Sequence, residues 1–306
     1  MKILHVVPGL EEGGNGIAVA ARLIAAEQGA DLIEARLFAG GDGELDGYDE
    51  VWVHSCWLPM TLKSCRRVLR AGKPLVRMMH GNLDPVRLKY HGWMKRLVGP
   101  IERGCLRRCD RIVATCAAEK EWIEAYLGKK CPVVEVTDIK RFFKLERDFG
   151  RDGKTAASPK GRDSLHILYL GRRHPLKGVE YLETAVKGIE GGELRVVCNA
   201  FGDEKERVWD WCDVLVLPTL SENFGLVVAE ALERGKRVIT TDGAPAWGKN
   251  LSRVEHVERV EGGLWSGYEG RLIYLKGYRD GTDEERVELL RRAIELMSVG
   301  EMMAVS

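Results

Sequence analysis

Two cationic side chains in the second half of the chain are spaced so that they could bind one anion. Arg172 and Lys177 lie five residues apart, in a loop that follows the apolar run 165–170. A guanidinium offers a planar fork to phosphate oxygens, and an ammonium offers a mobile point charge. The loop therefore indicates a phosphate-binding site, with a solvated basic turn as the alternative.

Two carboxylates accompany a helix predicted over residues 224–232, directly after an apolar strand at 214–217. Glu222 precedes this helix and Glu230 lies inside it, about 12 Å further along the axis and roughly on the same side. Carboxylates accept hydrogen bonds from hydroxyl groups, and the unpaired amides of a first helical turn can receive a phosphate. One helix could therefore hold a sugar, a diphosphate and a ribose. For Glu222 the alternative is a simple N-terminal helix charge, whereas Glu230 lies among apolar residues and needs a partner.

A glycine-rich turn joins a first strand at 3–7 to a helix at 17–27. Gly13, Gly14 and Gly16 would let the backbone approach a ligand at the N-terminus of that helix. The spacing is not G-x-G-x-x-G, and no acidic residue is expected at the end of the second strand, which disfavours a dinucleotide-binding fingerprint. Ligand contact and a flexible turn both stay open for this loop.

The elements that position these residues alternate between strands and helices along the chain. In the first half, we predict strands at 3–7, 32–38, 51–54, 75–79, 112–115 and 133–136, and helices at 17–27, 60–69, 95–106 and 118–126. In the second half, we predict strands at 165–170, 194–197, 214–217 and 238–241, and helices at 179–186, 224–232 and 283–297. The last of these opens with a capping box, Thr282 and Glu285. Such alternation predicts an α/β fold made of parallel β-α-β units.

The chain divides into two predicted Rossmann-like, doubly wound domains. The first covers 1–140 and is expected to bind an acceptor. A charged segment rich in Gly, Ser and Pro, 141–164, is the predicted linker. The second covers 165–306 and is expected to bind a nucleotide-sugar, with its last helix either in place or packed back on the first domain. Ligands of open α/β sheets bind beyond the carboxyl ends of the strands, so we expect a central cleft that both domains face.

Composition excludes several classes of protein. The 306 residues are 45% apolar and 30% charged, with a net charge of +1, as expected for a soluble globular chain without a global nucleic-acid-binding excess. No apolar run approaches the length of a membrane span, and the first residues do not form a signal peptide. Eight cysteines without a C-x-x-C pair predict reduced, half-buried thiols in a cytoplasmic protein, not a metal or redox site.

The motifs together resemble those of the GT-B glycosyltransferases of family GT4. In the second domain, the resemblance rests on Arg172-x4-Lys177, on Glu222-x7-Glu230 and on the segment 237–245. In the first domain, it rests on the segments 51–57, 73–76 and 80–85, the last reading His-Gly-Asn-Leu-Asp-Pro. It covers roughly residues 1–250. The departures are the short stretch between Val197 and Val214, where the family reads the nucleotide base, and Thr137-Asp138 in place of an Asn-Gly turn.

The resemblance implies a role for each matching residue. Arg172 and Lys177 would bind the donor diphosphate, together with the backbone of Asn223, Phe224, Gly225 and Leu226. Glu230 would hold the ribose. Glu222 would face the donor sugar, and His80 would lie near the reacting carbon, these two being the catalytic candidates. Gly13, Gly14 and Gly16 would border the cleft. The family retains anomeric configuration and needs no metal or other cofactor, and the chain has no D-x-D triplet.

The expected function is therefore transfer of a sugar from a nucleoside-diphosphate-sugar to a hydroxyl acceptor, in the synthesis of a cell-surface glycan, lipopolysaccharide or glycolipid. The alternatives are a catalytically silent GT-B module that binds nucleotide or acts as a scaffold, and a sugar-nucleotide epimerase. Between residues 61 and 111 the chain has 14 basic and three acidic residues. This segment predicts peripheral contact with the anionic inner face of the cell membrane, with a solvated set of helices as the alternative. No nucleic-acid partner is expected.

Overall fold

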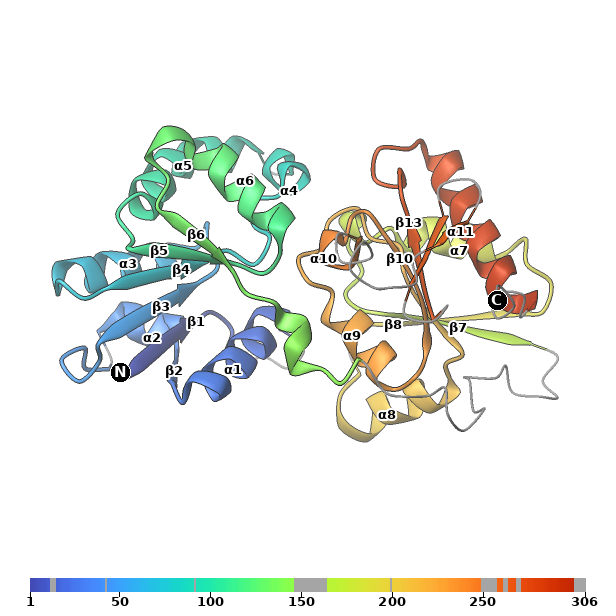
Figure 1. Ribbon diagram of the computed structural model, residues 1–306, viewed down its shortest axis with the longest axis horizontal. Coiled ribbons are helices and arrows are strands. Elements are labelled where there is room, and N and C mark those ends of the chain that lie inside the picture. The colour runs from blue at the N-terminus through green and yellow to red at the C-terminus, as the bar shows by residue number, and fades with distance from the viewer. Residues whose placement is uncertain are drawn as a thin grey trace. The chain divides into compact units, whose positions relative to one another are not determined.

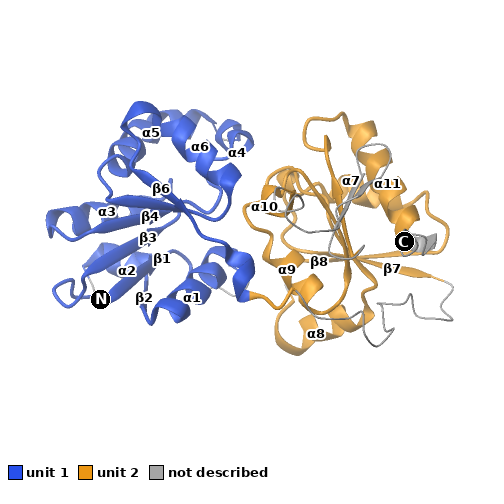
Figure 2. Ribbon diagram, viewed as in Figure 1, with its two compact units in different colours: residues 1–142 blue, residues 143–306 orange. Residues whose placement is uncertain are grey.

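The structure is a computed structural model that describes residues 1–11, 15–41, 43–90, 92–145, 164–198, 200–248, 258–260, 264–267 and 271–299. The chain forms two compact units, 1–142 and 143–306 (Figure 2). Most of the predicted linker, from 146 to 163, lies outside the described residues. The linker bounds therefore stay a prediction.

Unit 1 contains a parallel sheet in the strand order β2-β1-β3-β4-β5-β6. The strands are β1 (Ile3–Val7), β2 (Asp31–Glu34), β3 (Glu50–His54), β4 (Leu75–Met78), β5 (Arg111–Ala114) and β6 (Val133–Val136). The chain leaves β1 for β2 on one side and returns to β3 on the other. Doubly wound sheets bind ligands at the position where the strand order reverses in this way.

The helices of unit 1 cover both faces of this sheet (Figure 1). They are α1 (Gly16–Gln28), α2 (Ala35–Gly40), α3 (Pro59–Arg70), α4 (Pro85–Lys89), α5 (Gly92–Leu106) and α6 (Ala117–Leu127), with short 3-10 turns at Gly128–Lys130 and Ile139–Phe142. Apolar residues of α1 pack with Val7 on one face, and those of α2, α3, α5 and α6 form one core with Leu4, Val6 and Val53 on the other.

The prediction of a strand over 32–38 is wrong in its second half. The strand β2 ends at Glu34, and the remaining residues form helix α2. The Glu34 side chain caps that helix by accepting from the N–H of Arg36, and Phe38 is fully buried in the core. A short apolar run does not distinguish a strand from a buried helical turn, and here the cap decides between them.

Unit 2 contains a second sheet, in the order β11-β12-β13-β10-β9-β7-β8. The strands are β7 (Leu165–Leu170), β8 (Gly192–Val197), β9 (Val214–Leu217), β10 (Arg237–Thr241), β11 (Glu258–Val260), β12 (Leu264–Gly267) and β13 (Leu272–Leu275). Strands β8, β7, β9, β10 and β13 run parallel to one another. Strands β12 and β11 form an antiparallel edge that the sequence did not predict. Every residue of β9 is buried, as expected for a strand covered on both faces.

The helices of unit 2 are α7 (Val179–Val186), α8 (Gly202–Trp211), α9 (Leu226–Glu233), α10 (Pro245–Gly248) and α11 (Asp283–Val299), with a 3-10 turn at Pro175–Lys177. The predicted capping box opens α11: Thr282 and Glu285 each donate a backbone N–H to the side chain of the other. Helix α11 packs on α7 within unit 2. Among the described residues, no helix is both long enough and apolar enough to cross a bilayer.

Candidate active site

Two loops of unit 2 meet where its strand order reverses. The chain runs from β7 to β8 on one side and then to β9 on the other side of β7. The loop after β7 carries Arg172 and Lys177, and the loop after β9 carries Glu222. The fold thus places both predicted motifs at the carboxyl ends of two neighbouring parallel strands, where such sheets bind ligands.

Backbone contacts fix these two loops against each other. The carbonyl of Leu176 accepts from the N–H of Leu220 at 2.9 Å and from the hydroxyl of Thr219 at 3.0 Å. Gly178 has φ +63°, and a Cβ there would lie 2.1 Å from the carbonyl oxygen of Pro218. The close approach therefore requires glycine at this position.

Lys177 and Glu222 are in direct contact across the two loops. The Lys177 ammonium forms an ion pair with Oε2 of Glu222, and the two side chains are only 14% and 20% exposed. The other carboxylate oxygen accepts from the N–H of Asn223 at 3.0 Å, and the N–H of Glu222 donates to the carbonyl of Gly243 at 2.7 Å. The amide of Asn223, predicted to bind phosphate, is thus engaged by Glu222 in this structure.

Arg172 lies at the exposed rim of the same loop. Within the described ranges its guanidinium forms no ion pair, and its backbone carbonyl accepts from the Tyr169 hydroxyl at 2.8 Å. Burial, reinforced by the Glu222 carboxylate, raises the pKa of Tyr169, so the phenol stays protonated and holds the loop. The guanidinium is left facing solvent, where it can take an anion.

Helix α9 begins later than the sequence predicts. Gly225, with φ +71°, ends the loop in the left-handed region, and Leu226 is the first helical residue. Glu222 therefore lies in the loop, and the 12 Å helical separation from Glu230 does not apply. The Phe224 ring is buried against Trp247, which donates its indole N–H to the Phe224 carbonyl. The first turn of α9 has no side-chain cap, so its amides are suited to an anion.

Glu230 has a charged partner, as expected for a carboxylate among apolar residues. Its Oε2 lies 2.7 Å from Nζ of Lys205, with the side chains 22% and 28% exposed. Within the described residues this oxygen makes no well-directed hydrogen bond, so the contact is an ion pair. Lys205 lies on α8, a helix that the sequence analysis missed because it read the stretch before Val214 as short and unstructured.

In unit 1, His80 follows β4 in an unusual backbone conformation. Its φ is +52°, and the loop after the neighbouring strand β3 holds Ser55 at +68° and Trp57 at +69°. Left-handed conformations of non-glycine residues cost energy and cluster at functional sites. Because these residues lie together at the carboxyl ends of two adjacent strands, this region of unit 1 is a candidate functional site.

Three buried histidine rings form a continuous hydrogen-bonded chain that ends at His80. His54 joins His80 at 2.8 Å and His5 at 2.9 Å, and Nε2 of His5 contacts the Gln28 side-chain oxygen at 2.8 Å. The rings are stacked in sequence, with centroids 5.1 Å apart. With the Gln28 oxygen accepting from His5, each ring donates from Nε2 and accepts at Nδ1, so Nδ1 of His80 presents a lone pair.

The three rings are neutral at neutral pH. Burial lowers the pKa of His5 to about 4 and that of His80 to about 3. Burial also holds the pKa of His54 well below its usual range, and the neighbouring rings of His80 and His5 lower it further. Of these three histidines, only His80 was expected at the site from the sequence.

The turn that carries His80 is anchored by Glu119, which the sequence analysis also missed. This carboxylate is fully buried and accepts from the N–H of Gly81, and from both the N–H and the hydroxyl of Thr115 at 2.7 Å. A Glu four residues after a Thr, where a strand gives way to a helix, was the available signal.

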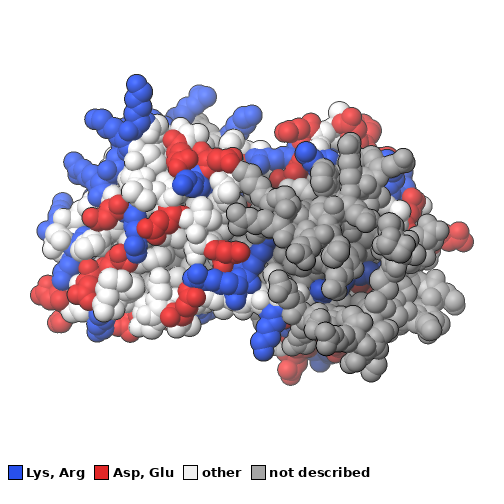
Figure 3. Space-filling model, in the orientation of Figure 1, with Lys and Arg blue, Asp and Glu red and all other residues white. Residues whose placement is uncertain are grey.

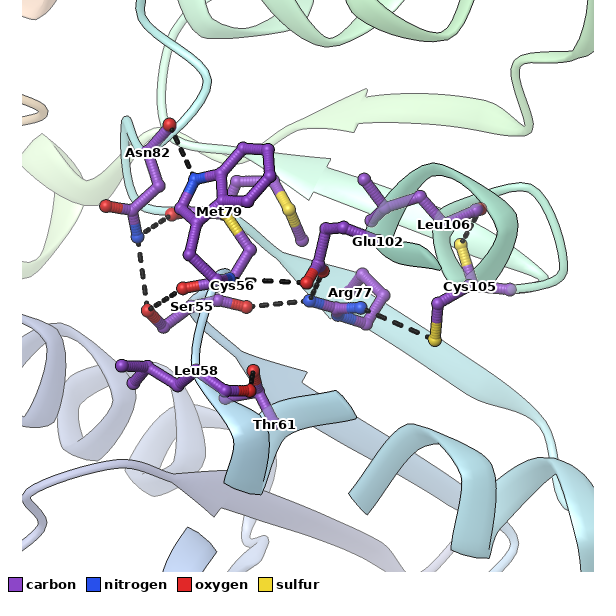
Figure 4. Close-up of polar contacts among 12 residues, drawn as sticks. Ser55, Cys56, Leu58, Thr61, Arg77, Met79, Asn82, Glu102, Cys105 and Leu106 are labelled. Carbon is purple, nitrogen blue, oxygen red and sulfur yellow. Dashed lines mark hydrogen bonds and ion pairs between the residues drawn. The ribbon is translucent and has the colours of Figure 1, made fainter. Parts of the chain in front are cut away.

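A buried ion pair holds the loop after β3 (Figure 4). Arg77 and Glu102 are both fully buried and lie 2.8 Å apart, and Arg77 also donates to the carbonyl of Ser55 at 2.7 Å. The second oxygen of Glu102 accepts from the N–H of Trp57 at 3.3 Å. Arg77, one of the 14 basic residues counted in segment 61–111, therefore does not contribute to a basic surface. A lone Arg within an apolar strand was the signal for a buried partner.

The glycine-rich turn is only partly described. Gly13 and Gly14 lie outside the described residues, and Gly16 is the first residue of α1, capped by Asn15. The expectation that no acid ends the second strand is wrong, because Glu34 is the last residue of β2. Its oxygens accept from the N–H groups of Gly9 and Leu10 at 3.2 and 2.6 Å, so this carboxylate serves to close the loop.

The eight cysteines are free thiols. Burial raises the pKa of several of them, including Cys109 and Cys212, each to about 12. No group of three or more His, Cys, Asp or Glu side chains in the described part of the chain is arranged to hold a metal ion.

Comparison with known proteins identifies both units. Residues 36–136 match the family Glycosyltransferase Family 4, and residues 159–255 match Glycosyl transferases group 1, so that about two thirds of the chain is matched. No curated protein sequence is detectably similar to the chain.

Solved structures with the same fold are distant in sequence. Sucrose-phosphate synthase from Thermosynechococcus elongatus is 15% identical, with a TM-score of 0.62 over 99% of this chain and 91% of that one. HepE from Anabaena in complex with UDP is 15% identical, with a TM-score of 0.56 over 99% and 97%. The lipopolysaccharide outer core galactosyltransferase WaaB is 14% identical, with a TM-score of 0.56 over 96% and 90%. Two doubly wound α/β units that match these families are the GT-B architecture, and the chain is a glycosyltransferase that belongs to family GT4.

Proposed function

We propose that the chain moves a sugar from a nucleoside-diphosphate-sugar to a hydroxyl acceptor, with retention of anomeric configuration. The observation that carries this proposal is the pairing of Lys177 with Glu222 at the strand-order reversal of unit 2, beside the exposed Arg172 and the uncapped start of α9. Cations and oriented amides at one strand edge favour a diphosphate, and a carboxylate beside them favours sugar hydroxyls.

The reaction breaks the bond between the anomeric carbon and the diphosphate, and forms a bond from that carbon to the acceptor oxygen. The acceptor proton passes to the departing diphosphate. Arg172 and Lys177 would neutralise the charge that develops on the leaving group, which is the task of a metal ion in other transferases. We therefore propose a metal-independent reaction without cofactor, to be tested by assaying transfer in the presence of EDTA.

The remaining roles are those that the family resemblance implies. Glu230 would accept from the ribose hydroxyls in exchange for its contact with Lys205. His80, neutral and with Nδ1 as an acceptor, would receive a hydrogen bond from a hydroxyl of the donor sugar and hold the reacting carbon. UDP-sugars are the first donors to test, because HepE was solved with UDP and with UDP-glucose.

The test is a panel of nucleotide-sugars, screened by thermal shift and then for transfer or hydrolysis. Glu230→Gln should weaken donor binding about 10-fold or more, because a hydrogen bond to a charged group contributes about 1.5–3 kcal/mol. The matched control is Glu204→Gln on exposed helix α8. Donor binding without transfer or hydrolysis, or no binding of any donor, would favour a silent module, and conversion of the sugar without transfer would favour an epimerase.

We further propose that the acceptor belongs to a surface glycan, lipopolysaccharide or glycolipid, and that unit 1 contacts the cytoplasmic face of the membrane. Lys and Arg side chains gather over the α3 and α5 side of this unit (Figure 3). Helix α5 also exposes Trp93, Leu97 and Ile101, which are 66%, 71% and 47% accessible. Apolar side chains among cations are typical of helices that lie on anionic bilayers.

A further inference from the structure

Unit 1 contains a pocket of about 580 Å³ that the proposed donor site does not use. Its walls come from the loop after β3, from α4 and α5, and from α6. The lining residues are Trp57, Leu88, Lys89, Gly92, Lys95, Arg96, Gly99, Pro100, Arg103 and Tyr126. The volume lies within the range typical of small-molecule sites.

The pocket has the charge of an anion-binding site. Four of its lining residues, Lys89, Lys95, Arg96 and Arg103, are cationic, and none of the lining residues is acidic. The nearest carboxylate in sequence is Glu102, whose oxygens are taken by Arg77 and by the Trp57 amide. Four cations without a counter-charge repel each other, so an anion that enters the pocket is favoured.

Arg103 is held in place by the aromatic ring of Tyr126. Its guanidinium lies 4.5 Å above the Tyr126 ring, and its buried Nε has no hydrogen-bond partner in the described part of the chain. Lys95 is fixed from the other side by the carbonyls of Arg87 and Tyr90, and burial lowers its pKa. A guanidinium held in this way can offer its terminal N–H groups to phosphate oxygens.

The aromatic wall connects the pocket to the loop that carries His80. The rings of Trp57 and Tyr126 meet edge to face at 6.0 Å, and the Trp57 indole donates to the carbonyl of Asn82 at 3.1 Å. Asn82 is two residues from His80. A ligand seated against Trp57 is therefore one hydrogen bond away from the proposed catalytic turn.

Beside the pocket, helix α5 exposes a row of apolar side chains, which we call the apolar row. Trp93, Leu97 and Ile101 recur every four residues and are exposed, and the pocket residues Arg96 and Arg103 lie on the same helix. A ligand that bears both a phosphate and a hydrocarbon chain would satisfy the cationic pocket and the apolar row together.

We propose that this pocket binds the phosphate of a lipid-linked acceptor, while the apolar row of α5 lies in the membrane that holds the lipid. The proposal rests on the proposed function, since it names the class of acceptor. It predicts recognition of a phosphate headgroup and not merely of negative charge. Phosphate monoester and carboxylate headgroups therefore provide the discriminating comparison.

The experiment measures binding of the full chain to phosphatidylcholine vesicles of equal negative charge that contain either phosphatidic acid or cholesteryl hemisuccinate, a carboxylate lipid without a phosphate. We expect tighter binding to phosphatidic acid. The double variant Arg96→Gln/Arg103→Gln should lose about 30-fold in affinity, or about 5-fold per cation. The matched control is Lys129→Gln/Lys130→Gln, an equal loss of charge at exposed positions outside the pocket, and thermal melting checks that each variant folds.

Three results would overturn the proposal: equal losses in the pocket and control variants, equal binding to the two acidic lipids, or binding of glucose 1-phosphate as tight as that of the vesicles. Hydrolysis of the donor sugar by water, measured without acceptor, separates this outcome from failure of the proposed function. The pocket variants should leave that hydrolysis unchanged, because neither Arg96 nor Arg103 is among the residues proposed to hold the donor.

Discussion

Acidification should destabilise unit 1 through the chain of His5, His54 and His80. In the unfolded chain each ring takes up a proton below about pH 6.5. In the fold, burial lowers the pKa of His5 to about 4 and that of His80 to about 3, and holds the pKa of His54 well below its usual range. The unfolded state then binds about three more protons than the native state. The free energy of unfolding should therefore fall by about 4 kcal/mol for each pH unit between pH 6 and pH 5.

The assay is denaturant unfolding of the full chain at several values between pH 5 and pH 7. Replacing His54 with Gln removes one titrating ring, and the slope should drop to about 3 kcal/mol per pH unit. The double variant His5→Gln/His54→Gln should lose a second share of the same size. Carboxylates titrate equally in all three proteins, so they cancel from the difference. Equal slopes in wild type and variants, or a cationic ring detected by nitrogen NMR in the folded protein at pH 6, would refute the reasoning.

Two stability predictions concern the frames that hold the loops. Gly243→Ala would bring a Cβ to 2.0 Å from the backbone oxygen of Thr219, so we expect a loss of about 1–3 kcal/mol in thermal or denaturant unfolding. Gly47→Ala, at a site with open space, should cost less than half as much. Arg77→Met leaves the Glu102 carboxylate buried without its cationic partner, and should lower the free energy of unfolding by about 3–5 kcal/mol. The double variant Arg77→Met/Glu102→Leu should recover most of this loss. Equal losses in the single and double variants would contradict this account.

The contact between the proposed donor-site residues of unit 2 was largely predictable from sequence, because these residues follow apolar strands directly. Parallel strands place their carboxyl ends at one edge, so Lys177 and Glu222 could be expected to meet from position alone. The start of α9 was not predictable, since the left-handed conformation of Gly225 depends on its packing against Leu217 and Trp247. Lys205 was missed because a charged amphipathic helix resembles a polar loop when read without its partner.

In unit 1, sequence patterns do not predict which buried polar residues contact each other. His5 and His54 lie in buried strands 49 residues apart, and their pairing exists only because β1 and β3 are neighbours in the sheet. The same holds for Arg77 and Glu102, which approach each other from a strand and a helix. A single polar residue in an apolar run signals that a partner exists, but the fold alone supplies its identity.

The region around His80 and the Lys177–Glu222 loops of unit 2 differ in how they accommodate buried ionisable groups. Around His80, burial removes charge altogether, and the histidine chain orients a neutral acceptor. In unit 2, charge is retained, and Glu222 compensates Lys177 within the donor site. A diphosphate that binds the ammonium competes with this carboxylate for it, and a Glu222 side chain released in this way could accept from sugar hydroxyls. Lys177→Met should therefore weaken UDP binding less than its contact with the diphosphate suggests, because the free protein loses the Glu222 ion pair as well, and Glu222→Gln should strengthen UDP while weakening a UDP-sugar.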